Sequence, residues 1–341
     1  MRFALSVVLL MNSLLLAGCS LFEKPQPVTL SGLAFHSMDW TVKVATLPEG
    51  KTAAQLQQEL QQLLDAANAV LSTYQSDTEL MRFNAAVAGQ WIKVSPMLFN
   101  AVREAQAVSV ATQGRYDITV GPLVNLWGFG PDAVPVKIPS EAAIAAARQF
   151  VGIEKISLDA NAMALRHEPG VKLDLSSMGE GIAVDVLAAR LQSLGLKDFM
   201  ISVAGCTRVS GKKPDGRPWV IAIEKPDGSG DVQQLLTLDA RSISTSGSYR
   251  NYREIDGLRY SHTIDPATGR PITHRGVSVS VIGGDTARVD AWATALNVLG
   301  PEEGYALAEA RGIPAYFIFH TDKGAEVRYT SAFKSFLPGA E

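Results

Sequence analysis

The chain has 341 residues, of which 31 are lysine or arginine and 34 are aspartate or glutamate, so its formal net charge is −3. The basic residues form no runs, which argues against nucleic acid as a partner. The two cysteines are Cys19, near the N-terminus, and Cys206. Because Cys19 belongs to a segment that is expected to be modified, as described below, no disulfide is expected within one mature chain. The length is enough for one large domain or for two closely joined lobes.

The first 18 residues predict a bacterial signal peptide. Arg2 precedes an apolar run at 3–16, which is shorter than the ~20 residues that a helix needs to span a bilayer, so a retained membrane anchor is the weaker interpretation. The run ends in LAGC at 16–19, which matches the bacterial lipobox. We therefore expect cleavage before Cys19 and acylation of its thiol. The alternative is an ordinary secretory signal followed by an unmodified cysteine.

This N-terminus predicts a lipid-anchored protein of the cell envelope that faces the periplasm. Ser20 stands where a signal for retention in the inner membrane would usually have Asp, which favours the outer membrane. Residues 19–27 are expected to form a polar, proline-containing tether, because they cannot bury a core. The folded domain is therefore expected at 28–341.

Hydrophobic periodicity in this domain predicts helices alternating with strands. A helix is expected at 52–72, and another at 95–112 with Ser95 as its N-cap, Pro96 in its first turn and Gly114 beyond its end. The remaining expected helices are 179–194, 287–299 and 302–310, and the expected strands are 155–158, 171–173, 199–203, 219–223, 242–245 and 278–282. This mixture, without an internal repeat, predicts an α+β fold in a single large mixed domain.

A long segment between helices, YDITVGPLVNLWGFG at 116–130, is the first candidate ligand-binding element. A simple connector would be shorter and more polar, whereas glycine and proline here allow the backbone to approach a flat, polar ligand. An aromatic mini-core beneath a long loop explains the same composition equally well.

The next candidate, DLSSMGEGIAVD at 174–185, follows an expected strand and enters an expected helix. A turn of this kind directs backbone N–H groups and the positive end of a helix towards an anion such as phosphate. The carboxylates of Asp174 and Glu180 could accept hydrogen bonds from a sugar or a purine. Simple capping of the helix is the alternative.

Hydroxyl groups and a histidine gather further along, in STSGSYR at 244–250 and YSHTIDPATGRP at 260–271. His262 stands beside Asp265, and its ordinary pKa suits proton exchange near neutral pH. A structural histidine that braces the following turn is an equal alternative.

Asp290 and Thr294 are four residues apart in the expected helix at 287–299, so their oxygens lie on one face. Two hard oxygen ligands suit Mg²⁺, which takes its remaining positions from carbonyl groups, water or phosphate. The commoner alternative is an Asp near a helix start, with a Thr that bonds back to a backbone carbonyl.

These stretches resemble the motifs of the ApbE family of flavin transferases. The matches run from about Met38 to Phe333 and Lys334, nearly all of the expected domain. The resemblance implies an ApbE-like, T-fold-related domain that uses Mg²⁺ to transfer FMN from FAD to a Thr or Ser hydroxyl of a client protein. The product would be a phosphoester and the leaving group AMP. The usual clients are flavoprotein subunits of membrane electron-transport complexes.

The resemblance also implies site residues. Asp290 would be central to catalysis, with His262 as one candidate to accept the proton of the client hydroxyl. Mg²⁺ would be held by Asp290, Thr294 and the backbone carbonyl of Ser177. The residues expected to bind FAD are Met38, Tyr74, Arg115, Tyr116, Asp117, Asp174, Glu180 and Ile264, with Tyr74 placed to stack on a ring.

Two positions depart from the family pattern or vary within it. The segment Ala204-Gly205-Cys206 stands where many members have two glycines followed by a polar residue, and the extra methyl of Ala204 puts the local backbone geometry in question. Cys206 is expected to be a buried apolar residue. Two other functions remain open on the sequence: an FAD carrier, and a pyrophosphatase that hydrolyses FAD to FMN and AMP.

Overall fold

The computed structural model describes residues 25–35, 37–132, 137–248 and 252–338. The expected signal peptide, Cys19 and the beginning of the tether lie outside these residues. Among the helices of the described ranges, none is both long enough and apolar enough to cross a bilayer.

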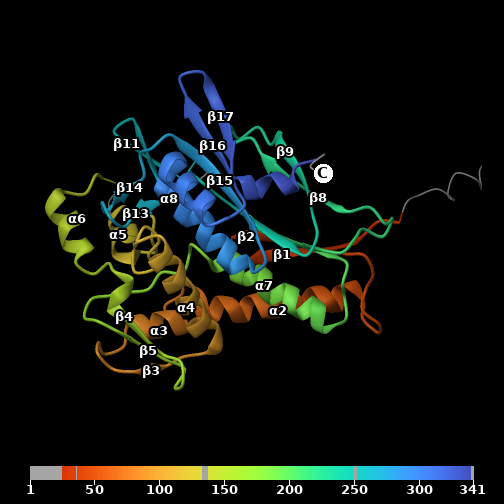
Figure 1. Ribbon diagram of the computed structural model, residues 1–341. Coiled ribbons are helices and arrows are strands. Elements are labelled where there is room, and N and C mark those ends of the chain that lie inside the picture. The colour runs from red at the N-terminus through yellow and green to blue at the C-terminus, as the bar shows by residue number, and fades with distance from the viewer. Residues whose placement is uncertain (1–24, 36, 133–136, 249–251, 339–341) are drawn as a thin grey trace, which may run out of the picture.

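An antiparallel sheet of eight strands forms the centre of the structure (Figure 1). Its order is β1-β2-β6-β7-β10-β15-β16-β17, so the N-terminal and C-terminal strands lie at opposite edges. Along β6, buried residues alternate with partly exposed ones, because successive side chains point to opposite faces. The strands are β1 (Val28–Ala34), β2 (Met38–Val44), β6 (Phe199–Val203), β7 (Cys206–Ser210), β10 (Arg241–Gly247), β15 (Gly276–Gly283), β16 (Ala315–Thr321) and β17 (Gly324–Tyr329).

Three helices cover one face of this sheet: α2 (Ala53–Leu71), α7 (Gly179–Ser193) and α8 (Thr286–Ala310). Thr52 and Gln55 form a capping box at the start of α2 and satisfy backbone N–H groups there. The buried stripe of α2 packs with α7 against β1, β2 and β6, whereas α8 packs on β15 and β16. The helices thus bury one of the two faces of the sheet.

The opposite face is covered by a hairpin of β8 (Trp219–Glu224) and β9 (Val232–Leu238), together with the 3-10 helix η2 (Ser331–Phe336). Trp219, Ile221 and Ile223 alternate with exposed residues along β8, so one side of the hairpin faces this second core.

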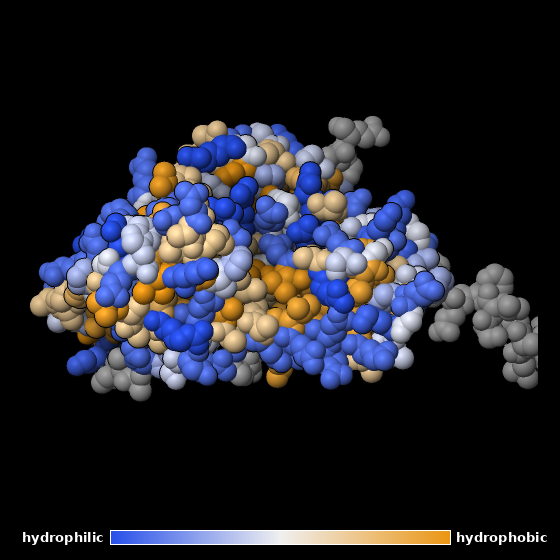
Figure 2. All heavy atoms as spheres, turned by 90° about the horizontal axis from the view of Figure 1, so that it is seen from below, coloured by the Kyte–Doolittle hydropathy of each residue, from blue (hydrophilic) through white to orange (hydrophobic). Residues whose placement is uncertain are grey.

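A further layer lies on the outer side of α7 and α8. It contains α3 (Glu79–Asn84), α4 (Pro96–Ala111), η1 (Ile153–Lys155) and a small sheet in the order β3 (Ile92–Lys93), β5 (Ala164–His167) and β4 (Ile156–Asp159). Its apolar residues form one cluster with Ile182, Ala291 and Ala295 of α7 and α8. Seen from below, the molecule has hydrophobic patches near the middle of the face and hydrophilic residues around them (Figure 2).

The last group of elements surrounds α5 (Gly121–Leu126) and α6 (Glu141–Arg148). Two small hairpins belong to it, β11 (Tyr252–Ile255) with β12 (Leu258–Ser261) and β13 (Ile264–Asp265) with β14 (Arg270–Pro271). Leu123, Trp127, Ile144 and Ile264 form its buried core.

Most of the expected elements are confirmed. The helix expected at 95–112 begins with Ser95 as N-cap, whose side chain accepts from the Leu98 N–H, and with Pro96 in its first turn. The expected strand 199–203 matches β6. The two helices expected at 287–299 and 302–310 are both present within α8, which is kinked between them at Gly300, a residue with non-helical dihedral angles that precedes Pro301.

The strand expected at 171–173 is wrong, since this apolar segment is not part of any sheet. Val171 and Leu173 are buried in the cluster around α4, and Asn84 binds both the N–H and the carbonyl of Leu173. Side-chain hydrogen bonds therefore satisfy the backbone in place of a ladder. Periodicity also missed several strands, among them β1, β2, β16 and β17.

Candidate functional site

The three expected magnesium ligands come together where the start of α7 meets α8. Asp290 and Thr294 lie one turn apart on α8, and the Thr294 hydroxyl is 3.5 Å from the Ser177 carbonyl oxygen. Ser177 precedes α7 by two residues. Three hard oxygen donors of different kinds therefore face one region.

Asp290 is buried, and both of its carboxylate oxygens accept hydrogen bonds. Oδ2 accepts from the Gly181 N–H at 3.0 Å, and Oδ1 accepts from the Ser244 hydroxyl at 2.9 Å. Burial first, and then the negative charge of Glu180, raise the pKa of Asp290 to about 8. These two donors and the Cys206 thiol, which also hydrogen-bonds Asp290, only partly offset this shift, so a cation at this position would stabilise the ionised carboxylate.

Glu180 occupies the first turn of α7 and accepts a hydrogen bond from the Gly205 N–H at 2.8 Å. Loss of hydration on burial raises the pKa of Glu180. A methyl group on Gly205 would lie 3.1 Å from the Thr245 carbonyl oxygen and 3.2 Å from Glu180, so the backbone approaches closely here.

The turn that carries Gly205 also lies beside the β1–β2 hairpin. The Ala204 N–H donates to the Asp39 carbonyl at 3.1 Å, and Met38 is the next residue back along β2. Ala204 has φ +43°, in the left-handed region that favours glycine. The methyl group of Ala204 therefore makes this backbone conformation strained, which is the effect that the sequence put in question. Cys206, the next departure, is fully buried in the core, as expected.

Tyr116, at the start of the segment 116–130, contacts the region where the three expected magnesium ligands meet, which we call the ligand region. It is buried, and its hydroxyl lies 3.0 Å from the Ser177 hydroxyl. Burial raises its pKa, so the phenol stays protonated. Asp174 is also buried; its N–H donates to the Ile118 carbonyl at 2.7 Å and its carboxylate accepts from the Ser176 N–H at 2.9 Å.

Asp117 braces the loop in which it lies. One oxygen accepts from the N–H and the hydroxyl of Thr119, at 2.8 and 2.6 Å, and the other accepts from the Ile153 N–H at 2.8 Å. Burial raises the pKa of Asp117, and these donors partly oppose the rise. Its contacts to the chain are thus structural.

Tyr74, Phe129 and His262 lie around a second part of the site. The Tyr74 hydroxyl donates to the Phe129 carbonyl at 3.2 Å, while 65% of the residue stays exposed. The Phe129 ring stands edge-on to the His262 ring at 6.5 Å between centroids. Tyr74 therefore presents a largely open aromatic ring next to Phe129, whose own ring contacts His262.

Arg115 and Ile264 both make contacts that stabilise the elements around α5 and the β13–β14 hairpin. Arg115 forms ion pairs with Asp265 at 2.9 Å and Glu303 at 3.0 Å. Ile264 is buried beneath the loop with Trp127, whose ring N–H donates to the Gly269 carbonyl at 2.9 Å. The aromatic mini-core considered for 116–130 is therefore present, and Tyr116 at the start of the same segment reaches Ser177.

Two residues that contact this region were not identified from the sequence. The Asp185 carboxylate accepts from the N–H groups of Thr286 and Ala287, at 3.0 and 2.9 Å, so a side chain of α7 caps α8. Ser244 is bonded to Asp290, as described above. Both residues lie inside the motifs quoted from the sequence, but their partners are 46 to 102 residues away.

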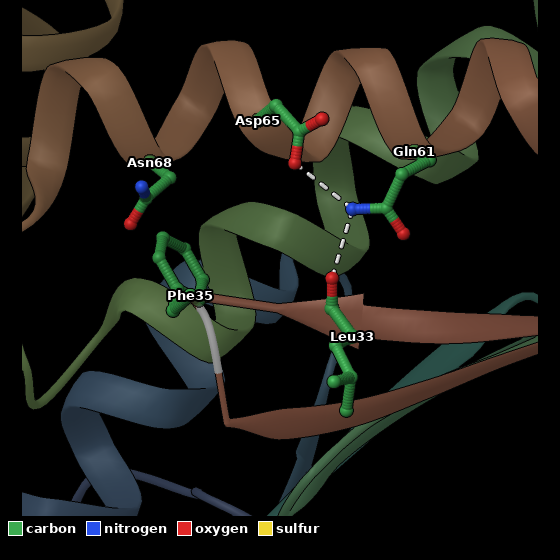
Figure 3. A pocket seen from close by; sticks show the side chains of 5 residues that line it. All are labelled: Leu33, Phe35, Gln61, Asp65 and Asn68. Atoms are coloured by element: carbon green, nitrogen blue, oxygen red, sulfur yellow. Dashed lines mark hydrogen bonds between the residues drawn. The ribbon is translucent and has the colours of Figure 1, made fainter.

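A pocket of about 340 Å³ lies between the β1–β2 hairpin and α2 (Figure 3). Its lining residues are Leu33, Phe35, Gln61, Asp65 and Asn68. The Gln61 amide donates to the Leu33 carbonyl at 2.8 Å and to Asp65 at 2.9 Å, which ties the hairpin to the helix. The ring of Phe35 lies near Gly179, the first residue of α7, so the pocket adjoins the ligand region. No expected site residue lines it.

Comparisons with known proteins show which family this chain resembles along most of its length. The model of the ApbE family matches residues 37–317. The FAD:protein FMN transferase of Vibrio cholerae is 43% identical over 333 residues, which cover 97% of this chain and 98% of that protein.

Solved structures show the same fold. The flavin transferase ApbE from Vibrio cholerae superposes with a TM-score of 0.84 at 41% identity, covering 92% of this chain and 99% of that one. The apo form of the Pseudomonas stutzeri flavinyl transferase ApbE gives a TM-score of 0.85 at 38% identity, covering 94% and 99%.

Proposed function

This chain belongs to the ApbE family, and we propose that it uses Mg²⁺ to transfer FMN from FAD to a Thr or Ser hydroxyl of a client flavoprotein, with release of AMP. It is a transferase with FAD as the flavin donor, the activity that its relatives' names give.

The meeting of Ser177, Asp290 and Thr294 carries this proposal. Carbonyl, carboxylate and hydroxyl oxygens are ligands that Mg²⁺ accepts, and they leave coordination positions for phosphate oxygens and water. In the described part of the chain, no three His, Cys, Asp or Glu side chains gather as a metal cluster, so a site richer in carboxylates or imidazoles has no support there. When bound, Mg²⁺ would neutralise charge on the diphosphate of FAD.

The residues around these ligands would bind and orient the flavin donor. The start of α7 favours negative charge such as a diphosphate. Tyr74 offers its open ring for stacking. Asp174 and Glu180 could accept hydrogen bonds from the sugar or the purine, and Met38, Arg115, Tyr116, Asp117 and Ile264 would complete the contacts or support them.

In the proposed reaction, a client hydroxyl oxygen forms a bond to the phosphorus of the FMN half of FAD. The bond from that phosphorus to the bridging oxygen breaks, and AMP leaves with that oxygen. The hydroxyl proton passes to a base, for which His262 beside Phe129 is one candidate. Asp290 would contribute through its negative charge at the metal position.

We propose that the protein is lipid-anchored and faces the periplasm. The lipobox supports acylation of Cys19 and a periplasmic location, with the outer membrane favoured by Ser20. Clients in such a location would be flavoprotein subunits of membrane electron-transport complexes. The names of the relatives do not favour the carrier or the FAD pyrophosphatase considered above.

The test incubates the full chain with FAD and Mg²⁺, with and without a flavin-acceptor domain. A transferase makes the acceptor covalently fluorescent after denaturing electrophoresis and releases one AMP per flavin attached. Release of AMP without labelling of the acceptor would instead identify a pyrophosphatase, and intact FAD would identify a carrier. Replacing Mg²⁺ with EDTA should stop the labelling.

A further inference from the structure

Strand β10 meets helix α8 through serines rather than through apolar side chains. Ser242, Ser244 and Ser246 share one face of β10, because they alternate along the strand. The Ser242 hydroxyl lies 2.8 Å from the Thr286 hydroxyl, the Ser244 hydroxyl donates to Asp290 at 2.9 Å, and the Asn297 amide donates to the Ser246 hydroxyl at 3.3 Å. We call these three contacts the serine ladder.

The neighbouring strand shows the contrast. On β15, Val279 and Val281 pack against Val289, Ala293 and Leu296 of the same helix in an ordinary apolar core. Ser244 pairs with Val281 across the sheet, so the polar ladder and the apolar contact lie side by side. Ser242 and Ser244 are almost completely buried. A buried hydroxyl costs free energy unless it is hydrogen-bonded, so each contact favours one position of the helix.

The spacing of the first two contacts fits the two elements. Two residues of a strand span about 6.6 Å, and four residues of a helix rise about 6 Å. Ser242 and Ser244 therefore stay in step with Thr286 and Asp290, which are four residues apart. The seven residues from Asp290 to Asn297 rise about 10 Å along the helix, which is longer than the two strand residues from Ser244 to Ser246. The hydrogen bond between Asn297 and Ser246 is accordingly longer than the other two.

We infer that Ser244 is a positioning residue, whose hydrogen bond holds the Asp290 carboxylate in the orientation that binds Mg²⁺. This inference rests on the proposed function, in which Asp290 is a metal ligand. The Asp290 carboxylate accepts from Ser244, Gly181 and the Cys206 thiol, and because an ionised carboxylate offers about four lone-pair sites, one remains for a metal ion, so coordination and orientation are compatible. Groups that orient a metal ligand commonly change metal affinity 10-fold to 100-fold when they are removed.

The experiment measures Mg²⁺ binding to the FAD-loaded full chain, without a client, by isothermal titration calorimetry. Ser244→Ala should raise the Kd for Mg²⁺ by about 10-fold. Ser244→Cys, which keeps a weak donor, should give an intermediate Kd. Ser242→Ala is the matched control: it removes a buried hydroxyl of the same ladder that contacts no proposed ligand, and should change the Kd less than about twofold.

Thermal unfolding of each variant separates positioning from general stability. Ser244→Ala and Ser242→Ala should lower Tm to a similar extent, while only the first weakens Mg²⁺. An unchanged Kd in Ser244→Ala, or an equal loss in Ser242→Ala, would overturn the inference and leave the proposed function standing. If the unmodified protein binds no Mg²⁺ with FAD present, the proposed metal site and the role of Ser244 are both wrong.

Discussion

The hydroxyl of Thr294 lies 3.5 Å from the carbonyl oxygen of Ser177, although 117 residues separate them in the sequence. One belongs to the middle of α8 and the other to the turn before α7. Their contact, with Asp290 one helical turn away, creates the oxygen-rich region on which the proposed chemistry depends.

Asp290→Ala should reduce FMN transfer by about 100-fold or more, because a charge that acts on the transition state is lost. FAD affinity should fall only modestly, since Tyr74 and the start of α7 remain. Thr294→Ala should act in the same direction but less, because water can replace a neutral hydroxyl ligand. Transfer is measured against Mg²⁺ concentration, and FAD binding by fluorescence quenching. Near-normal transfer by Asp290→Ala at low Mg²⁺ would place the metal elsewhere.

Asp185→Ala should destabilise the fold by about 1–2 kcal/mol, because the N–H groups of Thr286 and Ala287 lose their acceptor at the start of α8. The matched control is Asp285→Ala. Asp285 is the formal N-cap of α8, but its side chain makes no capping hydrogen bond. Chemical denaturation gives both free energies of unfolding; equal losses in the two variants would contradict the assignment of the cap to Asp185.

Glu59 should give a small acid-dependent contribution to stability. Its hydrogen bond to Lys51 comes first in lowering its pKa, burial opposes the shift, and Arg190 of α7 adds to the lowering. A lowered pKa stabilises the fold above the unfolded-state pKa, and this stabilisation is lost as the pH falls through the folded-state pKa. Solvent screening limits it to about 0.5–1 kcal/mol.

The measurement compares Tm of the unmodified protein and Glu59→Gln from pH 7 down to pH 3. The difference should be present at neutral pH and should shrink towards the acidic end. A difference that stays constant over this range would show that the ion pairs of Glu59 do not stabilise the fold.

Ala204→Gly should raise the free energy of unfolding by about 0.5–1 kcal/mol. Ala204 has φ +43°, where a side chain is strained and glycine is not, although the greater freedom of unfolded glycine offsets part of the gain. Cys206→Gly, at the other position that departs from the family pattern, should instead destabilise, since Cys206 is fully buried. Denaturant titration of the two variants tests the opposite signs.

Cys19→Ser should abolish acylation and release the protein from the membrane fraction, because the thiol is the group that would carry the lipid. Metabolic labelling with a fatty acid and membrane fractionation measure the two effects. Continued fractionation of the variant with the outer membrane would mean that the lipobox interpretation is wrong.

The sequence determined those features that depend on neighbours along the chain. The helix at 95–112 was predictable because Ser95 caps it and Pro96 suits its first turn. Asp290 and Thr294 were predictable as a pair because four residues in a helix bring two side chains to one face. The motifs further identified the family and nearly all candidate residues.

Tertiary structure decided which distant groups meet. In the folded chain the Ser177 carbonyl contacts Thr294, Ser244 hydrogen-bonds to Asp290, and Asp185 of α7 caps α8. Tertiary structure also overruled the strand expected at 171–173, where Asn84 binds the backbone of Leu173. None of these contacts leaves a local periodicity, because a backbone carbonyl or a short polar side chain gains its partner only when the helices pack on the sheet.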